Sequence, residues 1–471
     1  MPRLKTNYMD HSNPEDAGRE APAAGGTPAE NRVLLKTAGD YVILGADGAK
    51  QERGAAKIIL KEENISFLPE NGKALDIDIR EIDQAAADDY RVLLNLKSGA
   101  AVEISRLGYQ FEDFWRHFSA AWNAVLTDIF LMKETANKGS ARARVLRSGK
   151  DLGECQIQFY ETSFLVLPRD SGLFKIFYGD VDEMKARDFK IALSAEEESI
   201  ELSQMGQDFD FCAKTVNAGM TAISLNAQMQ IKEMAPGLDS LAARQLAEAM
   251  RDGHCVAKSR VDSLAAGAWE KIEGFLQTVG IKEEYDYLKS LADGGEIYAG
   301  VKRGAMGSLS GDYAWFLVPL KNNNAIAMEA SSESGSGKAT YFFRLVPPAE
   351  FGAKKNNLGR EVQKTVAAVQ KCVRRINFRR EPIYLPEEKL QDPKYWKYKF
   401  ALAQIPELRF LREIFIGRAL HRSPELWRKD VQKLLEFNVA AKDGAKWRAD
   451  GDDLEPPAAP EQNNAQNQNE I

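Results

Sequence analysis

The strongest candidate for a chemical role is a cluster of basic residues in the segment KCVRRINFRREP. Its members are Lys371, Arg374, Arg375, Arg379 and Arg380. Residues three and four apart share one side of a helix, so the first three are predicted to project together from a helix end. Val369, Val373 and Ile376 are predicted to hold the opposite side in a core. Ammonium and guanidinium groups clustered in this way bind the phosphates of nucleic acid or of an anionic membrane surface. We therefore predict an anionic-ligand patch here.

The same charges have a purely structural interpretation. Between positions 354 and 448 the chain holds 23 Lys and Arg against 11 Asp and Glu, a difference of +12 in a chain of net charge −6. Acidic residues alternate with the basic ones along this segment, a pattern typical of solvated helix faces. Arginines near a helix end also stabilise the helix through its dipole without any ligand. Both interpretations stay open at the level of sequence.

Motifs typical of catalysis are incomplete. The segment SESGSGKAT is similar to a phosphate-binding P-loop, but Ser332 stands where the motif needs glycine and Ala339 where it needs Ser or Thr. The glycine-rich segment GAMGSLSG, from Gly304, matches no dinucleotide fingerprint. His254 and Cys255 are adjacent, and we predict a helix end there, not a nucleophile with its base. We predict no catalytic, cofactor-binding or metal-binding residues, and hence no enzyme.

Composition indicates an intracellular protein. The four cysteines are far apart and never spaced as C-x-x-C, which favours reduced, buried thiols over a disulfide framework or a zinc site. The N-terminal segment lacks the apolar run of a secretory signal, and no stretch approaches the roughly 18 apolar residues of a membrane span. Because 471 residues exceed a single core, we expect a soluble, cytoplasmic, multi-domain protein.

An internal repeat organises the first half of the chain. The segment that starts at Lys57 returns from Cys155. At an offset of 99 residues the aligned pairs include Leu68 with Leu167, Ile77 with Ile176, and Leu94 with Leu193. After one deletion the offset becomes 98, and the aligned pairs include Glu103 with Glu201, Gly108 with Gly206, and Phe111 with Phe209. A match sustained over some sixty residues indicates two copies of one module.

Each copy is predicted to contain about seven short strands followed by one helix. Apolar residues first alternate with a period of two, which fixes the register of a sheet with one buried face. The period then changes to about 3.6, as expected for an amphipathic helix. In the first copy the apolar stripe of this helix comprises Phe111, Phe114, Trp115, Phe118, Trp122, Val125 and Ile129.

This order of elements resembles the pleckstrin-homology-like (PH-like) superfamily, in which a bent antiparallel sheet, nearly a barrel, is closed by a C-terminal helix. The resemblance covers residues 32 to 234 and implies that Trp115 and Trp122 plug the first barrel. Lipid-binding members share a K-x(n)-[KR]-x-R pattern in the first hairpin. The first copy has Glu52 where the final arginine belongs, and in the second copy Asp151 follows Arg144, Arg147 and Lys150. Another small module of strands and one helix is the alternative.

The predicted fold class is α+β, with tandem PH-like antiparallel barrels each closed by a C-terminal helix, a helical connector and a third strand-rich module. The predicted divisions are a disordered N-terminus at 1–31, PH-like module 1 at 32–133, PH-like module 2 at 140–234, the helical connector at 236–295, a strand-rich module with a terminal helix and a candidate third PH-like copy at 296–382, a basic helical segment at 383–440, and a disordered tail at 441–471.

These features predict a non-catalytic binding or scaffold protein whose tandem PH-like modules dock a protein or peptide partner, such as an extended peptide along an exposed sheet edge. The alternative is an anionic membrane-surface or nucleic-acid and chromatin binder that uses the basic C-terminal third. An enzyme with a site assembled across domains is a further alternative. The salt dependence of binding distinguishes the first two hypotheses, because phosphate contacts weaken steeply with ionic strength. The partner's identity and the oligomeric state stay open.

Overall fold

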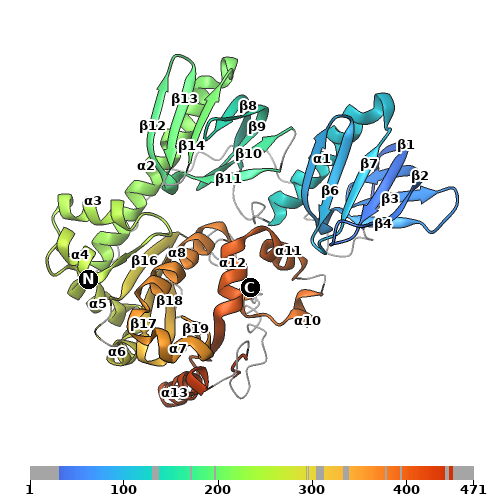
Figure 1. Ribbon diagram of the computed structural model, residues 1–471. Coiled ribbons are helices and arrows are strands. Elements are labelled where there is room, and N and C mark those ends of the chain that lie inside the picture. The colour runs from blue at the N-terminus through green and yellow to red at the C-terminus, as the bar shows by residue number, and fades with distance from the viewer. Residues whose placement is uncertain are drawn as a thin grey trace, which may run out of the picture.

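Three antiparallel sheets with their helices make up the protein, which is of the α+β class (Figure 1). The computed structural model describes residues 31–129, 137–169, 172–195, 198–292, 294, 296–303, 312–332, 339–376, 379–392, 395–440 and 445–448. The first two sheets lie side by side, and the third lies below them in the view of Figure 1.

The first sheet has seven strands in the order β4-β3-β2-β1-β7-β6-β5, and the helix α1 follows it. Helix α1 packs against β1 and β2, with Phe114, Phe118 and Trp122 on its buried face. The elements are β1 (Val33–Leu44), β2 (Lys50–Lys61), β3 (Asn64–Pro69), β4 (Leu75–Asp78), η1 (Ile79–Glu81), β5 (Ile82–Asp88), β6 (Arg91–Leu96), β7 (Ala101–Ser105), η2 (Gly108–Gln110) and α1 (Phe111–Ile129).

The second sheet repeats this topology in the order β11-β10-β9-β8-β14-β13-β12, and α2 follows it. We call the two sheets with their helices repeat 1 (33–129) and repeat 2 (137–234). The elements of repeat 2 are β8 (Asn137–Arg147), β9 (Lys150–Tyr160), β10 (Ser163–Pro168), β11 (Phe174–Phe177), η4 (Tyr178–Asp180), β12 (Val181–Arg187), β13 (Lys190–Ala195), β14 (Ser199–Ser203), η5 (Gly206–Asp208) and α2 (Phe209–Met234).

Local backbone geometry also repeats. In repeat 1 the β5–β6 turn places Asp89 and Tyr90 at positive φ, and the β12–β13 turn does the same with Asp188 and Phe189, 99 residues later. A positive φ is uncommon for an aromatic residue, so its recurrence at the same place shows a shared local design. Tyr90 packs on Phe111 with ring centroids 5.3 Å apart. Phe189 packs in the same way on the first residue of α2, at 5.5 Å.

Both seven-stranded sheets have two free edges. In repeat 2 these edges are β11 and β12, which the short η4 joins directly. Within the described residues no strand pairing links the two edges across this corner, so the sheets are not closed into barrels. The corner between β11 and β12 is therefore open to neighbouring elements.

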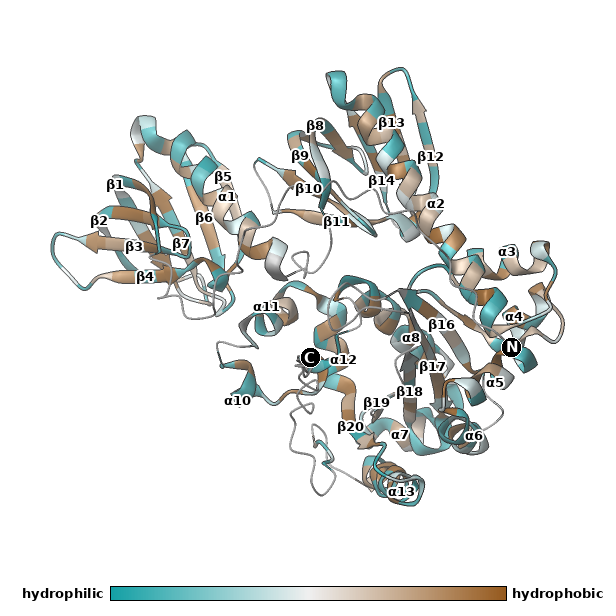
Figure 2. Cartoon of the chain, turned by 180° about the vertical axis from the view of Figure 1, so that it is seen from behind, coloured by the Kyte–Doolittle hydropathy of each residue, from teal (hydrophilic) through white to brown (hydrophobic). Residues whose placement is uncertain are grey.

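The third sheet has six strands in the order β15-β16-β17-β18-β19-β20. Its central strands are mainly apolar (Figure 2), because helices cover both faces. Along β17, Trp315 and Leu317 face the side of α8 (Gly359–Arg375) and α12 (Pro406–Ile414). Phe316 and Val318 face the side of α5 (Ala268–Thr278), α6 (Lys282–Leu291) and α13 (Pro424–Ala440). The strands are β15 (Cys255–Ala257), β16 (Tyr298–Arg303), β17 (Asp312–Leu320), β18 (Ala325–Ser332), β19 (Ala339–Arg344) and β20 (Phe415–Leu420).

The helices of this third domain surround its sheet. Before β16 come α3 (Ser240–Ala249), α4 (Lys258–Leu264), α5 (Ala268–Thr278) and α6 (Lys282–Leu291). After β19 come α7 (Pro348–Lys354), α8 (Gly359–Arg375), α9 (Glu381–Tyr384), α10 (Glu387–Leu390), α11 (Trp396–Gln404), α12 (Pro406–Ile414) and, after β20, α13 (Pro424–Ala440). Two further short helices are η6 (Lys321–Asn323) and η7 (Lys355–Asn357).

The C-terminal half differs from the expected division. The segments 236–295 and 383–440 were expected to be helical, but they supply the two edge strands β15 and β20 of the third sheet. The strand order of this sheet also differs from that of the repeats, so residues 296–382 are not a third copy. Residues 445–448, inside the expected disordered tail, lie against β20, where the Trp447 amide donates to the Ile416 carbonyl at 2.8 Å. The rest of that tail and residues 1–30 lie outside the described residues.

Candidate functional site

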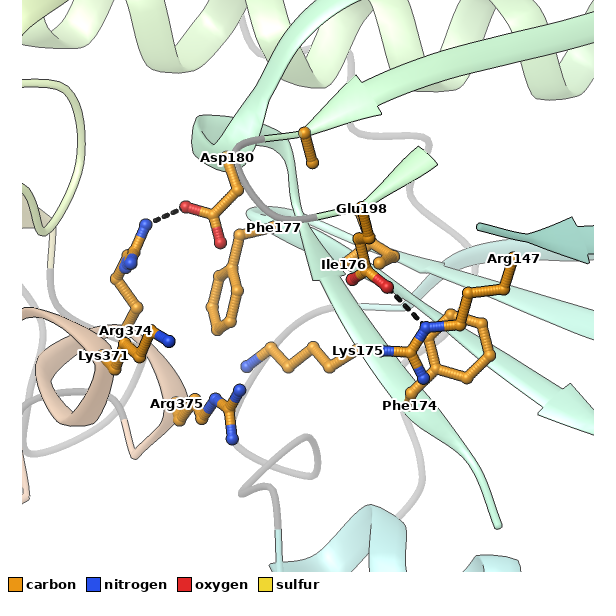
Figure 3. A pocket seen from close by; sticks show the side chains of 11 residues that line it. Arg147, Phe174, Lys175, Ile176, Phe177, Asp180, Glu198, Lys371, Arg374 and Arg375 are labelled. Carbon is orange, nitrogen blue, oxygen red and sulfur yellow. Dashed lines mark hydrogen bonds and ion pairs between the residues drawn. The ribbon is translucent and has the colours of Figure 1, made fainter. Parts of the chain in front are cut away.

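A cavity of about 200 Å³ lies between the open corner of repeat 2 and the helix α8 of the third domain (Figure 3). We call it the basic cavity. Strand β11 and the end of β13 form one wall, and the last turn of α8 forms the other. The lining residues are Arg147, Phe174, Lys175, Ile176, Phe177, Asp180, Ala195, Glu198, Lys371, Arg374 and Arg375.

Lys175 is the central cation of this cavity. It lies in β11 among apolar neighbours, and Figure 3 shows its side chain and that of Arg375 reaching into the same space from opposite walls. Its Nζ atom is fully buried and donates no hydrogen bond within the described residues, and the nearest aromatic ring, Phe177, is 4.3 Å away. Burial and, to a smaller extent, the charge of Lys302 lower the pKa of Lys175 to about 7. A buried ammonium without an acceptor is costly, so the cavity favours an anion.

The last turn of α8 supplies three further cations. Helix α8 is amphipathic, and Val369, Val373 and Ile376 are buried as the sequence predicts. Lys371 and Arg375 share one carboxylate, because each approaches Glu407 of α12 to only 3.6 Å. The distance to Arg375 is long for a charge-assisted hydrogen bond, so this guanidinium keeps capacity for another acceptor.

Arg374 has a different role, which is to join repeat 2 to the third domain. Its Nη1 donates to Asp180 Oδ1, and its side chain is only 7% exposed. His254 Nε2 lies 3.3 Å from the same oxygen and 2.6 Å from Arg374 Nη1. Burial raises the pKa of Asp180, but the contact with His254 and the charge of Arg374 outweigh it, so the pKa lies below its usual range. Burial lowers the pKa of His254, which disfavours the charged imidazolium.

Arg147 closes the cavity on the side of repeat 2. It lies at the end of β8, where its guanidinium stacks 4.0 Å above the ring of Phe174 and its Nε donates to Glu198. Figure 3 shows this pair at the rim opposite Arg374 and Asp180. The aromatic ring and the carboxylate hold the arginine in place, so it presents a positive charge of fixed position to the cavity.

The structure divides the basic cluster predicted from the sequence. Lys371, Arg374 and Arg375 line the basic cavity, whereas Arg379 and Arg380 do not. Arg379 lies 3.8 Å from Glu381, and the guanidinium of Arg380 lies 5.5 Å from the ring of Tyr341. The last two residues of the predicted patch therefore belong to the packing of the third domain.

Two basic residues of the cavity were not part of the predicted patch. Arg147 was noted only in the first hairpin of repeat 2, and Lys175 was missed. The detectable signal was a lone lysine in the apolar run LFKIFYGD, at a position where repeat 1 has Asp76. Asp76 is tied to the side chains of Asn64 and Ser66, so repeat 1 has no equivalent cation.

Other candidates from the sequence do not form a second site. His254 and Cys255 do not end a helix, because Cys255 begins strand β15. Burial raises the pKa of Cys255 to about 12, so its thiolate is scarce at neutral pH. The segments 304–311 and 333–338, which hold most of the two glycine-rich motifs, lie outside the described residues. Across the described helices, none is long and apolar enough to cross a membrane.

Comparisons with known proteins add no family. No protein family and no curated protein matches the chain. Solved structures do match, among them one described as "Structure of the Spt16D Pob3N heterodimer", with 12% sequence identity over 38% of this chain and 88% of that chain. The TM-score of this match is 0.16, so the likeness carries no argument about fold or function. What defines the protein is its own geometry, an α+β chain with a basic cavity at a domain junction.

Proposed function

We propose that this chain is a non-catalytic binding protein built on two PH-like repeats, and that its basic cavity binds an anionic group. The observation that carries the proposal is Lys175, whose buried Nζ has no acceptor within the described residues although it faces further cations. Phosphate and carboxylate oxygens are the acceptors that lysine and arginine side chains bind most strongly.

The PH-like assignment is supported by the order of the elements. Each repeat has seven antiparallel strands in the same order and one helix at its C-terminal end. In repeat 1 this helix packs across β1 and β2, and Trp115 and Trp122 on it are 3% and 4% exposed, as the plug of such a module requires. The assignment stays part of the proposal because it rests on topology alone.

The non-catalytic assignment is supported by the lining of the cavity. Among the described residues that line it, the side chains are cationic, acidic or apolar, and none is a serine, threonine or cysteine that an acid-base partner would activate. His254 lies next to the cavity, and its Nε2 is within hydrogen-bond distance of Asp180 and Arg374. The cavity is therefore better suited to binding a charged group than to catalysing a reaction on it.

Of the predicted binding modes, the anionic one has the stronger support. Docking of a peptide along β12 is opposed by the charged side chains of this strand, Asp182, Glu183, Lys185 and Arg187, which protect an edge from pairing. The β5 edge of repeat 1 is contacted by Gln404 of α11, which donates to the Asp83 carbonyl at 3.1 Å. A recessed cavity also differs from the flat basic surface that nucleic acid or a bilayer would use.

The test is a titration of the full chain with inorganic phosphate at low salt, followed by calorimetry. Saturable binding is expected, and Lys175→Met is expected to weaken it by about 1.5 to 3 kcal/mol, the contribution of a charge-assisted hydrogen bond. Lys190→Met is the matched control, because Lys190 lies on β13 of the same repeat with a side chain 56% exposed. If phosphate and sulfate both fail to bind at low salt, the proposed function is wrong.

A further inference from the structure

We infer that the group held in the basic cavity is a phosphorylated side chain, presented by an extended peptide that pairs with the free edge of β11. The inference rests on the proposed anion-binding function and names its ligand. It is carried by three observations: the charge of the cavity, its size and depth, and the unpaired strand in its wall.

The charge of the cavity matches a phosphate monoester. Its five cations, Arg147, Lys175, Lys371, Arg374 and Arg375, face three carboxylates, Asp180, Glu198 and Glu407. Among the described residues that line the cavity, cations outnumber carboxylates when Lys175 is protonated. A phosphorylated serine, threonine or tyrosine carries about −1.5 to −2 at pH 7 and offers three acceptor oxygens. A single carboxylate carries one negative charge and offers two acceptor oxygens.

The size and depth of the cavity favour a phosphate that is carried on a single side chain. The cavity volume of about 200 Å³ is below the roughly 300 to 1,000 Å³ of pockets that enclose whole small molecules. It suits one phosphate group and the atoms next to it. The Nζ atom of Lys175 is buried and Arg374 is 7% exposed, so a flat bilayer surface does not reach them. We expect a side chain that projects from an extended backbone to reach them.

The wall of the cavity contains an unpaired strand edge. Strand β11 pairs with β10 from Phe174 opposite Val166 to Phe177 opposite Ser163, and no strand pairs with its other edge within the described residues. An extended peptide that adds to such an edge gains backbone hydrogen bonds, and every second side chain points to the same face. One phosphorylated side chain in this register would enter the cavity while its backbone continues along β11.

The two repeats differ in this feature. Strand β4 of repeat 1 is also an edge, but Asp76 stands at the position of Lys175 and is bound to its own neighbours. A phosphorylated peptide would meet a negative charge there. We therefore expect repeat 2 alone to bind it.

The experiment screens the full chain against peptides that carry phosphoserine, phosphothreonine or phosphotyrosine between randomised flanks, with unphosphorylated peptides in parallel. Enrichment of phosphorylated peptides is expected. By anisotropy, Lys175→Met and Arg375→Gln should each weaken the tightest peptide about tenfold to a hundredfold. Arg379→Gln is the matched control from the same basic cluster and should leave binding unchanged. Circular dichroism confirms that each variant is folded.

Four outcomes overturn the inference. If inorganic phosphate binds through Lys175 but no phosphorylated peptide binds more tightly, the ligand is a small anion and only the proposed function stands. If phosphatidylcholine vesicles that contain a phosphatidylinositol phosphate bind through Lys175 and the peptides do not, the ligand is a lipid headgroup. If N-methylation of the amides that flank the phosphorylated residue leaves the affinity unchanged, pairing with β11 is wrong. If the wild-type chain binds neither phosphate nor any phosphorylated peptide, both proposals are wrong.

Discussion

Lys175 is a charged residue inside an apolar strand, and its neighbours determine how it titrates. Burial and the charge of Lys302 lower its pKa, Asp252 and Asp180 act in the opposite direction, and the net value is about 7. Arg375, Lys371 and Arg147 face it across the cavity. Without ligand, the side chain is therefore close to half protonated at neutral pH. An anion in the cavity would stabilise the charged form and raise this pKa.

This coupling predicts proton uptake on binding. At pH 8 the ligand-free lysine is mostly neutral, whereas the bound lysine is charged, so phosphate binding should take up close to one proton. At pH 6 both states are charged, and uptake at Lys175 should vanish. Calorimetry in buffers of different ionisation enthalpy measures the proton number, and Lys175→Met should abolish the uptake at pH 8. Binding at pH 8 that is tight but without proton uptake would contradict the role of Lys175.

The same pKa predicts how stability depends on pH. The unfolded state binds a proton at Lys175 up to a pKa of about 10.4, but the folded state releases it at about 7. The unfolded state therefore holds more protons between these values, and the free energy of unfolding should rise with pH across this window. Lys97, whose pKa burial also lowers to about 7, contributes in the same direction. The difference between wild type and Lys175→Met in urea unfolding at pH 6 and pH 9 isolates Lys175, and an equal difference at both pH values would contradict this.

At the scale of elements, the contact between η4 and α8 holds repeat 2 against the third domain. Asp180→Asn leaves the buried Arg374 without its carboxylate, which should cost up to about 3 kcal/mol. Asp151→Asn makes the same change in a pair with Arg144 whose side chains are 42% and 46% exposed. This control should cost much less, because exposed ion pairs are weak. Urea unfolding compares the two, and equal costs would show that Arg374 does not depend on Asp180.

Helix α1 makes a second prediction at this scale. Trp122 stacks on Phe118 with ring centroids 5.9 Å apart, and its ring also covers Gly172 of repeat 2, where an added Cβ would lie 3.1 Å from Cη2. Trp122→Ala should therefore destabilise the protein by about 3 to 5 kcal/mol. Tyr109→Ala, at a residue 93% exposed, should change little. An unchanged melting temperature in Trp122→Ala together with lost binding would assign this residue to a site instead.

The sequence predicts those elements whose information is local or repeated. Val92 and Ile191, 99 residues apart, lie in β6 and β13, which hold the same place in the two sheets. The face of α8 was predictable from its period. In contrast, β15 has only three residues, too few to show a period, and β20 follows α12 directly. These strands form because the uncovered edges of the third sheet are available to them, which only the folded chain shows.

The same distinction applies to the site. Lys371 and Arg375 were predicted because they lie close together on one helix. Lys175 lies almost two hundred positions earlier, and its role depends on how repeat 2 sits against α8. The only local sign of it was a lysine in an apolar strand.

At the scale of the whole molecule, the basic cavity joins two domains. Arg147 and Lys175 come from repeat 2, whereas Lys371, Arg374 and Arg375 come from the third domain. An anion between them cancels the repulsion of like charges across the junction. Binding should therefore strengthen the contact between the domains as well as fill the cavity.

This arrangement predicts that one ligand protects two segments distant in sequence. At a ligand concentration of 100 times Kd, the folded state should gain about 2.7 kcal/mol, seen as a higher melting temperature. Amide hydrogen exchange should slow both in 172–180, around β11, and in 359–376, around α8. Exchange in β4 of repeat 1 should stay unchanged, because Asp76 replaces the lysine there. Arg375→Gln should reduce the protection in both segments together, since each wall depends on the anion that the other wall helps to hold. Protection confined to β11 would show that the ligand contacts repeat 2 alone and that α8 contributes no part of the site.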